Sequence, residues 1–351
     1  MAFVMSVAKS LAGYYYEQEE IEPWLADWLS KHGKSPEKEL RMCRNAQVAA
    51  RSSILPIEDI FRPKSLTECS QIYKERSIEL GVRVSRTVIE RAGLSPKDID
   101  MIITVSCTGF MIPSVDAYLI NEIDMRPDIK RLPITEMGCA AGAVGLSRAR
   151  EYLKGFPDHS VLLLSVELPT LTFQLNDLSM DNIVSTAIFG DGAAAALLCG
   201  SPRGKAPRLS DSRTFSIPES THLMGFDLGD EGFLIRLSKE IPEAVRTRVR
   251  PILDDFLAQN SMTLDEISHL IFHPGGKRIL EVYRDELGIS EESLHFSYKV
   301  LRECGNVSSA TVLMVLEEIM RNGETQKGDT GLVLAMGPGF SIEQLLIRWE
   351  G

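Results

Sequence analysis

Several features that would place this chain of 351 residues in other protein classes are missing from its sequence. Its six cysteines form no CxxC pair, which disfavours a zinc site and favours a reduced protein. The N-terminus lacks a basic segment followed by an unbroken apolar stretch, so we expect no signal peptide. No run approaches the roughly 20 apolar residues that span a bilayer. We therefore expect a cytoplasmic protein without a membrane span.

Basic residues are also in the minority. The 49 Asp and Glu residues outnumber the 38 Lys and Arg residues, which gives a formal net charge of −11. Such a chain is repelled by polyanions, so no nucleic-acid partner is expected. An anionic substrate would need a local cluster of cations.

The chain does contain an internal repeat of one α/β pattern. Residues 94–105 (LSPKDIDMIITV) and 262–273 (MTLDEISHLIFH) each combine a capped start, an acidic turn and a short apolar strand. Each is followed by a helix that begins at a glycine, Gly138 or Gly305, and then by a Gly-Asp pair that leads into an apolar strand. Three matches in the same order predict an α/β fold built from a duplicated unit.

The polar stretch 201–213 lies between the two patterns and is predicted to connect them. We accordingly divide the chain into an N-terminal half, residues 1–205, and a C-terminal half, residues 206–351. Two similar halves would bring the two glycine-initiated helices to equivalent positions that face a shared centre.

Cys139 is the first candidate for a reactive side chain. It follows Gly138 and opens a helix of small residues, Ala140 to Ala143. Free amide groups and the partial positive charge at a helix N-terminus favour the thiolate, which is the reactive form of cysteine. The cysteines without this setting are interpreted as inert: Cys43, Cys69, Cys199 and Cys304.

His273 and Asn306 are the candidate partners of this cysteine. His273 ends an apolar strand and precedes a Pro-Gly-Gly turn, where α/β folds place their chemistry. Its imidazole could pair with Cys139, act as a base or donate to an oxyanion. Asn306 follows Gly305 and could be a simple helix cap. The duplication instead places it opposite Cys139, where a neutral donor could stabilise an enolate.

The stretches around these residues resemble the type III polyketide synthases, the chalcone-synthase-like branch of the thiolase superfamily. The resemblance covers nearly the whole chain. Its motifs are EMGCAAG around Cys139, IFGDGAAA from Ile188, LIFHPGG around His273, GNVSSAT around Asn306 and GPGFSIE from Gly337. It implies a thiolase fold, in which two duplicated halves form a layered αβαβα core. It also implies a homodimer with no metal or redox cofactor.

The resemblance further implies that Cys139 accepts a starter acyl group from a CoA thioester. His273 and Asn306 would promote decarboxylation of malonyl-CoA and stabilise the enolate, which attacks the acyl group on the cysteine. After several extensions the chain would cyclise by lactonisation, aldol or Claisen closure. Malonyl-CoA and acyl-CoA are substrates in this scheme, and no acyl-carrier protein is required.

Other site residues follow from the same resemblance. Phe189 matches a gatekeeper between CoA tunnel and cavity, although core packing is its plain alternative. Lys38 and Arg41 match a basic pair that holds CoA phosphates, although a solvated helix face would look the same. Ile112 lies in a loop, MIP, that resembles one reaching across the dimer. The remaining expected positions are Gly275 and Gly276 at the CoA site, and Cys107, Thr172, Phe233, Ile235, Ser308 and Met336 in the cavity.

Departures from the plant enzymes indicate a bacterial-type enzyme. Ile235 stands where a second gatekeeper phenylalanine is usual, Cys107 replaces a threonine, and Met336 lies in a variant of the GFGPG loop. Smaller gating and lining side chains favour an aliphatic or malonyl starter over a rigid coumaroyl one. Our first prediction for the product is an alkylpyrone or alkylresorcinol made from a fatty acyl starter. A malonyl-primed aromatic of the tetrahydroxynaphthalene or phloroglucinol type comes second.

Two further functions stay open as alternatives. An initiating β-ketoacyl-acyl-carrier-protein synthase shares the fold and the Cys-His-Asn triad but performs one condensation. The GPGFSIE and IFGDG motifs argue against it. A non-catalytic member would keep the fold as a binding protein, which the intact triad disfavours.

Overall fold

The computed structural model describes residues 1–202, 204–322 and 325–350. Its strands are β1 (Phe3–Leu11), β2 (Tyr14–Glu17), β3 (Ala50–Ser53), β4 (Met101–Val105), β5 (Lys130–Ile134), β6 (Ser160–Glu167), β7 (Gly192–Cys199), β8 (Pro207–Ser216), β9 (Met224–Gly229), β10 (Gly232–Leu237), β11 (His269–Phe272), β12 (Thr330–Gly337) and β13 (Ser341–Trp349). Its helices are α1 (Gln18–Lys31), α2 (Glu37–Asn45), α3 (Ile57–Ile60), α4 (Leu66–Arg91), α5 (Val115–Glu122), α6 (Ala141–Gly155), α7 (Met180–Ile188), α8 (Ile241–Gln259), α9 (Lys277–Leu287), α10 (His295–Cys304) and α11 (Thr311–Arg321).

The order of the strands repeats between the two halves. Nine strands form one sheet in the order β11-β12-β13-β8-β1-β7-β6-β4-β5. Outward from β1, strand β7 is antiparallel to both its neighbours, and β6 is parallel to β4. Outward from β8, strand β13 is antiparallel to both its neighbours, and β12 is parallel to β11. The matching order and directions confirm the predicted duplication, with β1 and β8 as the seam.

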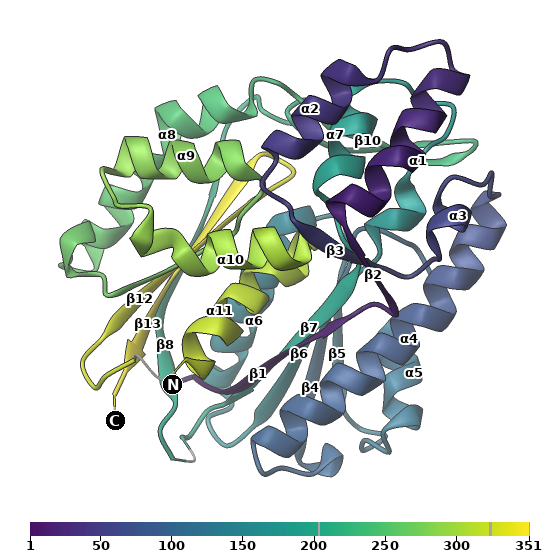
Figure 1. Cartoon of the computed structure of the whole chain (residues 1–351). Helices are drawn as coiled ribbons and strands as arrows, with labels where there is room; N and C mark the ends of the chain where they lie inside the picture. The colour runs from purple at the N-terminus through teal and green to yellow at the C-terminus, as the bar shows by residue number, and fades with distance from the viewer. Residues whose placement is uncertain (203, 323–324, 351) are drawn as a thin grey trace.

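Helices cover these strands in three layers (Figure 1). The helices α4 and α5 lie outside the N-terminal strands, α8 to α10 lie outside the C-terminal strands, and α6 and α11 lie between the two. The strands support this arrangement because their apolar residues alternate between faces. In β6, Val161 and Leu163 join the central core, whereas Leu162 and Leu164 join the outer one. The arrangement is the αβαβα core expected from the sequence.

The polar stretch predicted as a connection is shorter than expected. Strand β8 begins at Pro207 and pairs along its length with β13, so most of 201–213 belongs to the sheet. Arg208, Asp211 and Arg213 form ion pairs at its surface, which explains how a polar sequence can be a strand here. Residue 203 of this stretch lies outside the described residues. The division at residue 205/206 stays a prediction.

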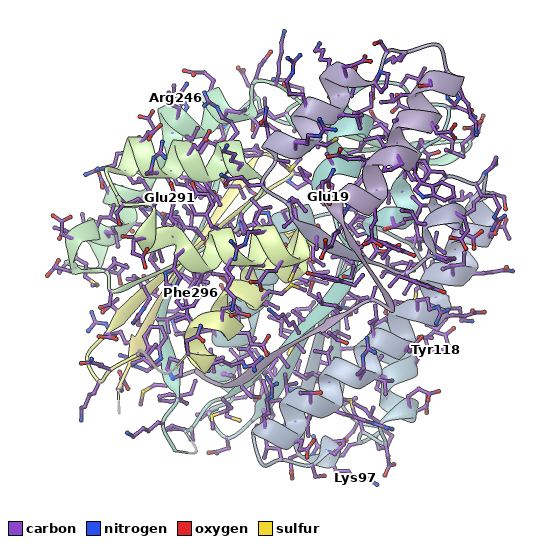
Figure 2. The ribbon with its side chains drawn as sticks, in the orientation of Figure 1. Glu19, Lys97, Tyr118, Arg246, Glu291 and Phe296 are labelled. Atoms are coloured by element: carbon purple, nitrogen blue, oxygen red, sulfur yellow. The ribbon has the colours of Figure 1, made fainter. Side chains whose placement is uncertain are left out.

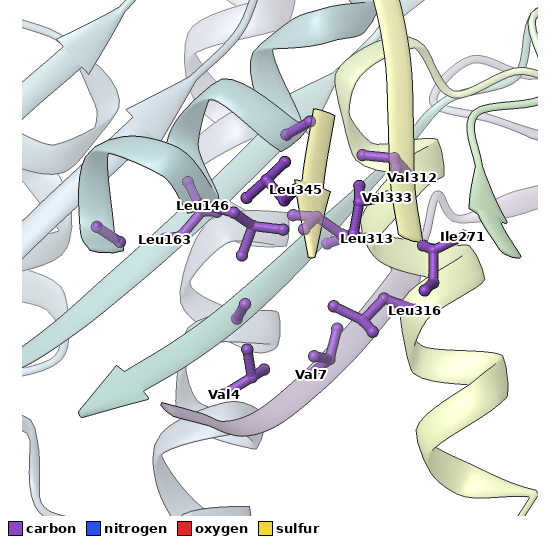
Figure 3. Packing of buried hydrophobic residues seen from close by; sticks show 14 of the residues in the cluster. Val4, Val7, Leu146, Leu163, Ile271, Val312, Leu313, Leu316, Val333 and Leu345 are labelled. Atoms are coloured by element: carbon purple, nitrogen blue, oxygen red, sulfur yellow. The ribbon is translucent and has the colours of Figure 1, made fainter. Parts of the chain in front are cut away.

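The central core is built from α6, α11 and the strand faces that enclose them (Figure 3). Leu146 of α6 and Leu313 of α11 are fully buried, together with Val333 of β12. Glycines let the backbones approach closely. A methyl group on Gly142 would clash with the carbonyl oxygen of Ser309, and one on Gly145 would meet Leu163. Small residues therefore set the distance between the two central helices.

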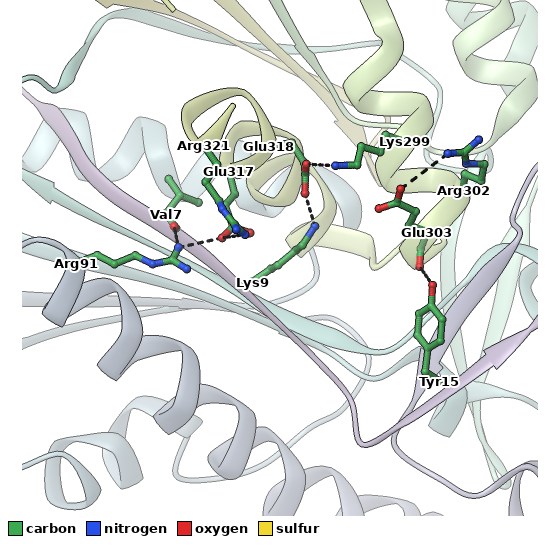
Figure 4. A network of polar contacts seen from close by, with 10 residues as sticks. All are labelled: Val7, Lys9, Tyr15, Arg91, Lys299, Arg302, Glu303, Glu317, Glu318 and Arg321. Atoms are coloured by element: carbon green, nitrogen blue, oxygen red, sulfur yellow. Dashed lines mark hydrogen bonds and ion pairs between the residues drawn. The ribbon is translucent and has the colours of Figure 1, made fainter. Parts of the chain in front are cut away.

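Ion pairs tie the far end of α11 to the N-terminal half (Figure 4). Glu318 pairs with Lys9 of β1 and with Lys299 of α10, and Glu317 pairs with Arg91 of α4. Figure 2 shows side chains filling the space between the layers, with Lys97 and Arg246 at the periphery. Among the residues described, no helix is long and apolar enough to cross a membrane.

The close contact at Gly142 predicts a strong effect of added volume. We expect Gly142→Ala to destabilise the fold by about 1–3 kcal/mol, because overpacking forces the helix backbones apart. Gly155→Ala, at the exposed end of the same helix with nothing within 4 Å, should be neutral or up to about 1 kcal/mol stabilising. Urea unfolding of both variants measures the difference. Equal midpoints would refute the packing argument.

Candidate active site

A cavity of about 1420 Å³ opens beside the N-terminal ends of the two central helices. Its walls come from both halves and from the β9–β10 hairpin, which forms a separate two-stranded sheet. Residues of α2, α7 and α9 complete the wall. The elements α2, α7 and β10 lie together at the top of Figure 1. The exposed surface of the lining is mainly apolar, with polar and charged side chains interspersed, as is typical of small-molecule sites.

The same local structure presents Cys139 and Asn306 to this cavity. Each follows a glycine with positive φ, +50° at Gly138 and +70° at Gly305. A side chain at Gly138 would clash with Pro338, and one at Gly305 would clash with the carbonyl of Ile188. A short 3₁₀ turn then leads into α6 or α11. The predicted helices therefore begin slightly later than their glycines, but their equivalence is confirmed.

Cys139 is buried, and its thiol donates to the hydroxyl of Ser308 at 3.7 Å. Burial raises the pKa of Cys139 to about 12, and the hydrogen bond to Ser308 opposes this only in part. The sequence led us to expect that the helix terminus would favour the thiolate. The structure differs, because desolvation of the charged form outweighs the terminus. The protein in this state holds a neutral thiol, so a base must take its proton when it reacts.

His273 is a candidate base in the cavity wall. It follows β11 directly, is 3% exposed, and neither ring nitrogen has a partner among the residues described. Burial lowers its pKa to about 3. The imidazole is therefore neutral at pH 7, with one nitrogen able to accept a proton and the other able to donate.

Asn306 is held firmly by its surroundings. Its side-chain oxygen accepts from the backbone N–H of Ser308 at 2.8 Å and from the hydroxyl of Thr311 at 3.3 Å. Its side-chain nitrogen donates to the carbonyl of Gly275 at 3.2 Å, two residues after His273. These bonds fix the orientation of the amide. The amide is a neutral donor on the same wall as the imidazole.

A second thiol lies beside the first. The sulfur of Cys107 is 3.4 Å from the hydroxyl of Ser308, the same group that Cys139 contacts. Glu167, fully buried at the end of β6, accepts from the N–H of Cys107 at 3.1 Å and from Thr108 at 2.8 Å. Burial raises the pKa of Glu167, although hydrogen bonds oppose the shift. Cys107 and Ser308 were predicted as cavity residues, whereas Glu167 was not, although its place at a strand end was the available signal.

Most of the predicted site residues line this one cavity. It brings together residues spread over more than 200 positions of the sequence, which are Cys107, Cys139, Thr172, Phe189, Phe233, Ile235, His273, Gly275, Gly276, Asn306, Ser308 and Met336. Phe189 also pairs with Asn306 through the backbone, which places the expected gatekeeper next to the expected oxyanion donor. The roles of these residues stay predictions.

Three predicted residues do not line the cavity. Lys38 and Arg41 are exposed on α2, although they share a helix face with Asn45, which does line it. Ile112 is 83% exposed and lies outside the cavity of this chain, after Met111 and before Pro113. These positions therefore lie on the surface of the single chain.

The structure adds a group of cations that the sequence analysis missed. The lining includes Arg236 of β10, Lys239 just after the hairpin, and Lys277 and Arg278 in the first turn of α9. The last two stand directly after Gly276 in the HPGGKR segment, so the signal was present in the sequence. The described residues contain no group of three or more His, Cys, Asp or Glu placed to hold a metal ion.

Comparison with known proteins agrees with this geometry. The family model of chalcone and stilbene synthases matches the chain twice, with its N-terminal domain at residues 1–202 and its C-terminal domain at 209–349. The chain belongs to this family, the type III polyketide synthases. It is thus an acyltransferase that forms carbon–carbon bonds.

Several relatives of this type III polyketide synthase are bacterial. A 1,3,6,8-tetrahydroxynaphthalene synthase of Streptomyces peucetius subsp. caesius is 36% identical over 99% of this chain and 93% of its own length. A phloroglucinol synthase of Pseudomonas fluorescens is 32% identical over 88% of each chain. The crystal structure of 1,3,6,8-tetrahydroxynaphthalene synthase from Streptomyces coelicolor A3(2) matches with a TM-score of 0.95 and 29% identity over both full chains. The predicted thiolase fold is confirmed.

The lowered pKa of His273 predicts a loss of stability in acid. The unfolded chain binds a proton on this residue below pH 6.5, whereas the folded chain does not until about pH 3. Stability should therefore fall as the pH drops from 6.5 toward 3, by up to about 1.4 kcal/mol per pH unit from this residue. His273→Gln cannot titrate and should lose less stability over the same range. Urea unfolding at pH 6.5, 5.5 and 4.5 compares the two, and identical slopes would contradict a buried neutral imidazole.

Proposed function

We propose that this type III polyketide synthase extends an aliphatic acyl-CoA starter with malonyl-CoA, using Cys139, His273 and Asn306. The observation that supports it is the convergence of these three side chains in one large, mainly apolar cavity. An apolar cavity favours an alkyl chain by the hydrophobic effect. The proposed steps use protein side chains alone, and CoA thioesters enter as substrates. Such thioesters are cytosolic metabolites, so a cytoplasmic location stays our expectation.

Loading begins at the buried thiol. Neutral His273 takes the proton as the sulfur of Cys139 attacks the acyl-CoA carbonyl, and the bond to CoA breaks. The proton passes to the departing CoA sulfur, so CoA leaves as a thiol. A burial-raised pKa keeps the thiol protonated until substrate arrives. The base is therefore part of the loading step rather than a resting ion-pair partner.

Extension uses His273 and Asn306 as hydrogen-bond donors. The N–H of neutral His273 and the side-chain N–H of Asn306 would hold the thioester oxygen of malonyl-CoA while its carboxylate leaves as CO₂. The resulting enolate attacks the acyl group on Cys139, and the sulfur departs. The product is a β-ketoacyl-CoA two carbons longer, which can return to Cys139. Asn306 suits this role because its orientation is fixed by three hydrogen bonds.

A homodimer belongs to the same proposal. Phe110 and Ile112 are 59% and 83% exposed in the single chain, in one loop beside the cavity wall. Neighbouring exposed apolar side chains of this size mark interaction surfaces. We propose that the loop is covered by the second subunit.

A malonyl-primed aromatic synthase is the second candidate. It is favoured by the relatives named for tetrahydroxynaphthalene and phloroglucinol synthesis, and by the thiol of Cys107 in the cavity. Such an enzyme would need no starter other than malonyl-CoA.

A panel of starters separates these candidates. We expect the purified protein to convert malonyl-CoA with hexanoyl- to palmitoyl-CoA into α-pyrones or alkylresorcinols, because the cavity is large and apolar. Mass spectrometry of the products is the measurement, and Cys139→Ala should abolish product formation as the control. A single phenolic product from malonyl-CoA alone would favour the second candidate. Turnover restricted to carrier-protein thioesters would reject both.

The cations at the cavity wall predict how CoA is held. We expect Lys277→Ala together with Arg278→Ala to raise the KM for malonyl-CoA roughly three- to tenfold, since the CoA phosphates lose their cationic partners. The KM for malonyl-pantetheine, which lacks the nucleotide phosphates, should not change. Lys97→Ala removes a remote charge, paired with Asp124, and serves as the control. An equal rise in KM for both thioesters would show that these cations do not bind the CoA phosphates.

A further inference from the structure

A polar group without an assigned role lies in the cavity wall. Tyr283 on α9 contributes to the lining and is 0% exposed, and its hydroxyl has no hydrogen-bond partner in the described part of the chain. Its ring packs edge-on against Phe272, the residue before His273, with centroids 5.2 Å apart and an angle of 71°. This packing holds the ring, and with it the direction of the hydroxyl.

Two other hydroxyl groups of the cavity are already engaged. The hydroxyl of Thr172 donates to the carbonyl of Pro169 at 2.8 Å, and Ser308 faces both sulfurs. In the described ranges, unpartnered buried atoms occur on three lining side chains, His273, Tyr283 and Arg236.

His273 and Tyr283 differ from Arg236 in how well the rest of the side chain is bonded. The guanidinium of Arg236 pairs with Asp227 through another nitrogen, so its side chain is held. The role of His273 follows from the proposed reaction. The hydroxyl of Tyr283 is the group that remains without a purpose.

An unpartnered hydroxyl at this position is costly. A buried polar group without a hydrogen bond destabilises a fold by about 1–3 kcal/mol, and a phenylalanine of the same shape would avoid that cost. A polar atom kept at such a site is a candidate for a functional role. Burial raises the pKa of Tyr283. The phenol is therefore protonated at neutral pH and able to donate.

We propose that the hydroxyl of Tyr283 donates a hydrogen bond to a carbonyl oxygen of the growing poly-β-keto chain and thereby selects the conformation that is extended or cyclised. A poly-β-keto thioester carries a carbonyl acceptor at every second carbon, which suits a single fixed donor. Tyr283 is thus a specificity-determining residue, and the inference rests on the proposed function because the chain must be built at Cys139.

The test is Tyr283→Phe, which removes one oxygen and keeps the ring. Loss of one neutral hydrogen bond should lower the ratio of the longest product to shorter lactones about two- to tenfold. The KM for malonyl-CoA should stay within about twofold, and the unfolding midpoint should be unchanged or higher. Tyr298→Phe is the matched control, because Tyr298 packs against the same outer core outside the cavity. It should leave the product ratio unchanged.

The outcomes separate this inference from the function beneath it. A parent enzyme that makes polyketides, with an unaltered product ratio and kcat in Tyr283→Phe, overturns the inference alone. A parent enzyme that makes no polyketide overturns the proposed function and this inference with it. A lower unfolding midpoint in Tyr283→Phe also counts against the inference, because the hydroxyl would then have a structural partner.

Discussion

The close apposition of α6 and α11 is the contact on which the rest of the structure depends. It joins the two halves at their centre and brings Cys139 and Asn306 to the same cavity. Its closeness requires Gly142, since any side chain there would meet the backbone of Ser309. Ser309 in turn donates to Glu167, which holds Cys107 through its N–H. The packing of two helices therefore positions the thiols as well as the core.

Burial is the second consequence of this arrangement, and it decides the electrostatics of the site. The chain carries an excess of acidic residues, yet the groups around Cys139 are governed by desolvation rather than by net charge. The pKa of the thiol rises to about 12 and that of His273 falls to about 3, so both are neutral at pH 7. Because both groups are neutral, a proton must leave the thiol when Cys139 reacts. This differs from the thiolate that a helix terminus alone would favour.

Burial also explains why some polar groups of the cavity lack a hydrogen-bond partner. The polar atoms of His273 and Tyr283 face no protein partner in the described residues, whereas those of Asn306 are held by three bonds. A fold tolerates such unmet groups where a ligand can complete them. The stability lost there is supplied by the central core, in which leucines and valines of both halves are fully buried.

The sequence by itself determined the fold class, the duplication and the three candidate reactive side chains, because local motifs carry these signals. A glycine before Cys139 or Asn306 marks a required backbone conformation, and an apolar strand ending at His273 marks the edge of a sheet. Only the tertiary structure decided the protonation of the thiol and the imidazole, since burial depends on every neighbouring element. It also showed the cations of α9 and the free hydroxyl of Tyr283 in the cavity wall. Such groups acquire meaning only through what packs around them, and that information is spread over the whole chain.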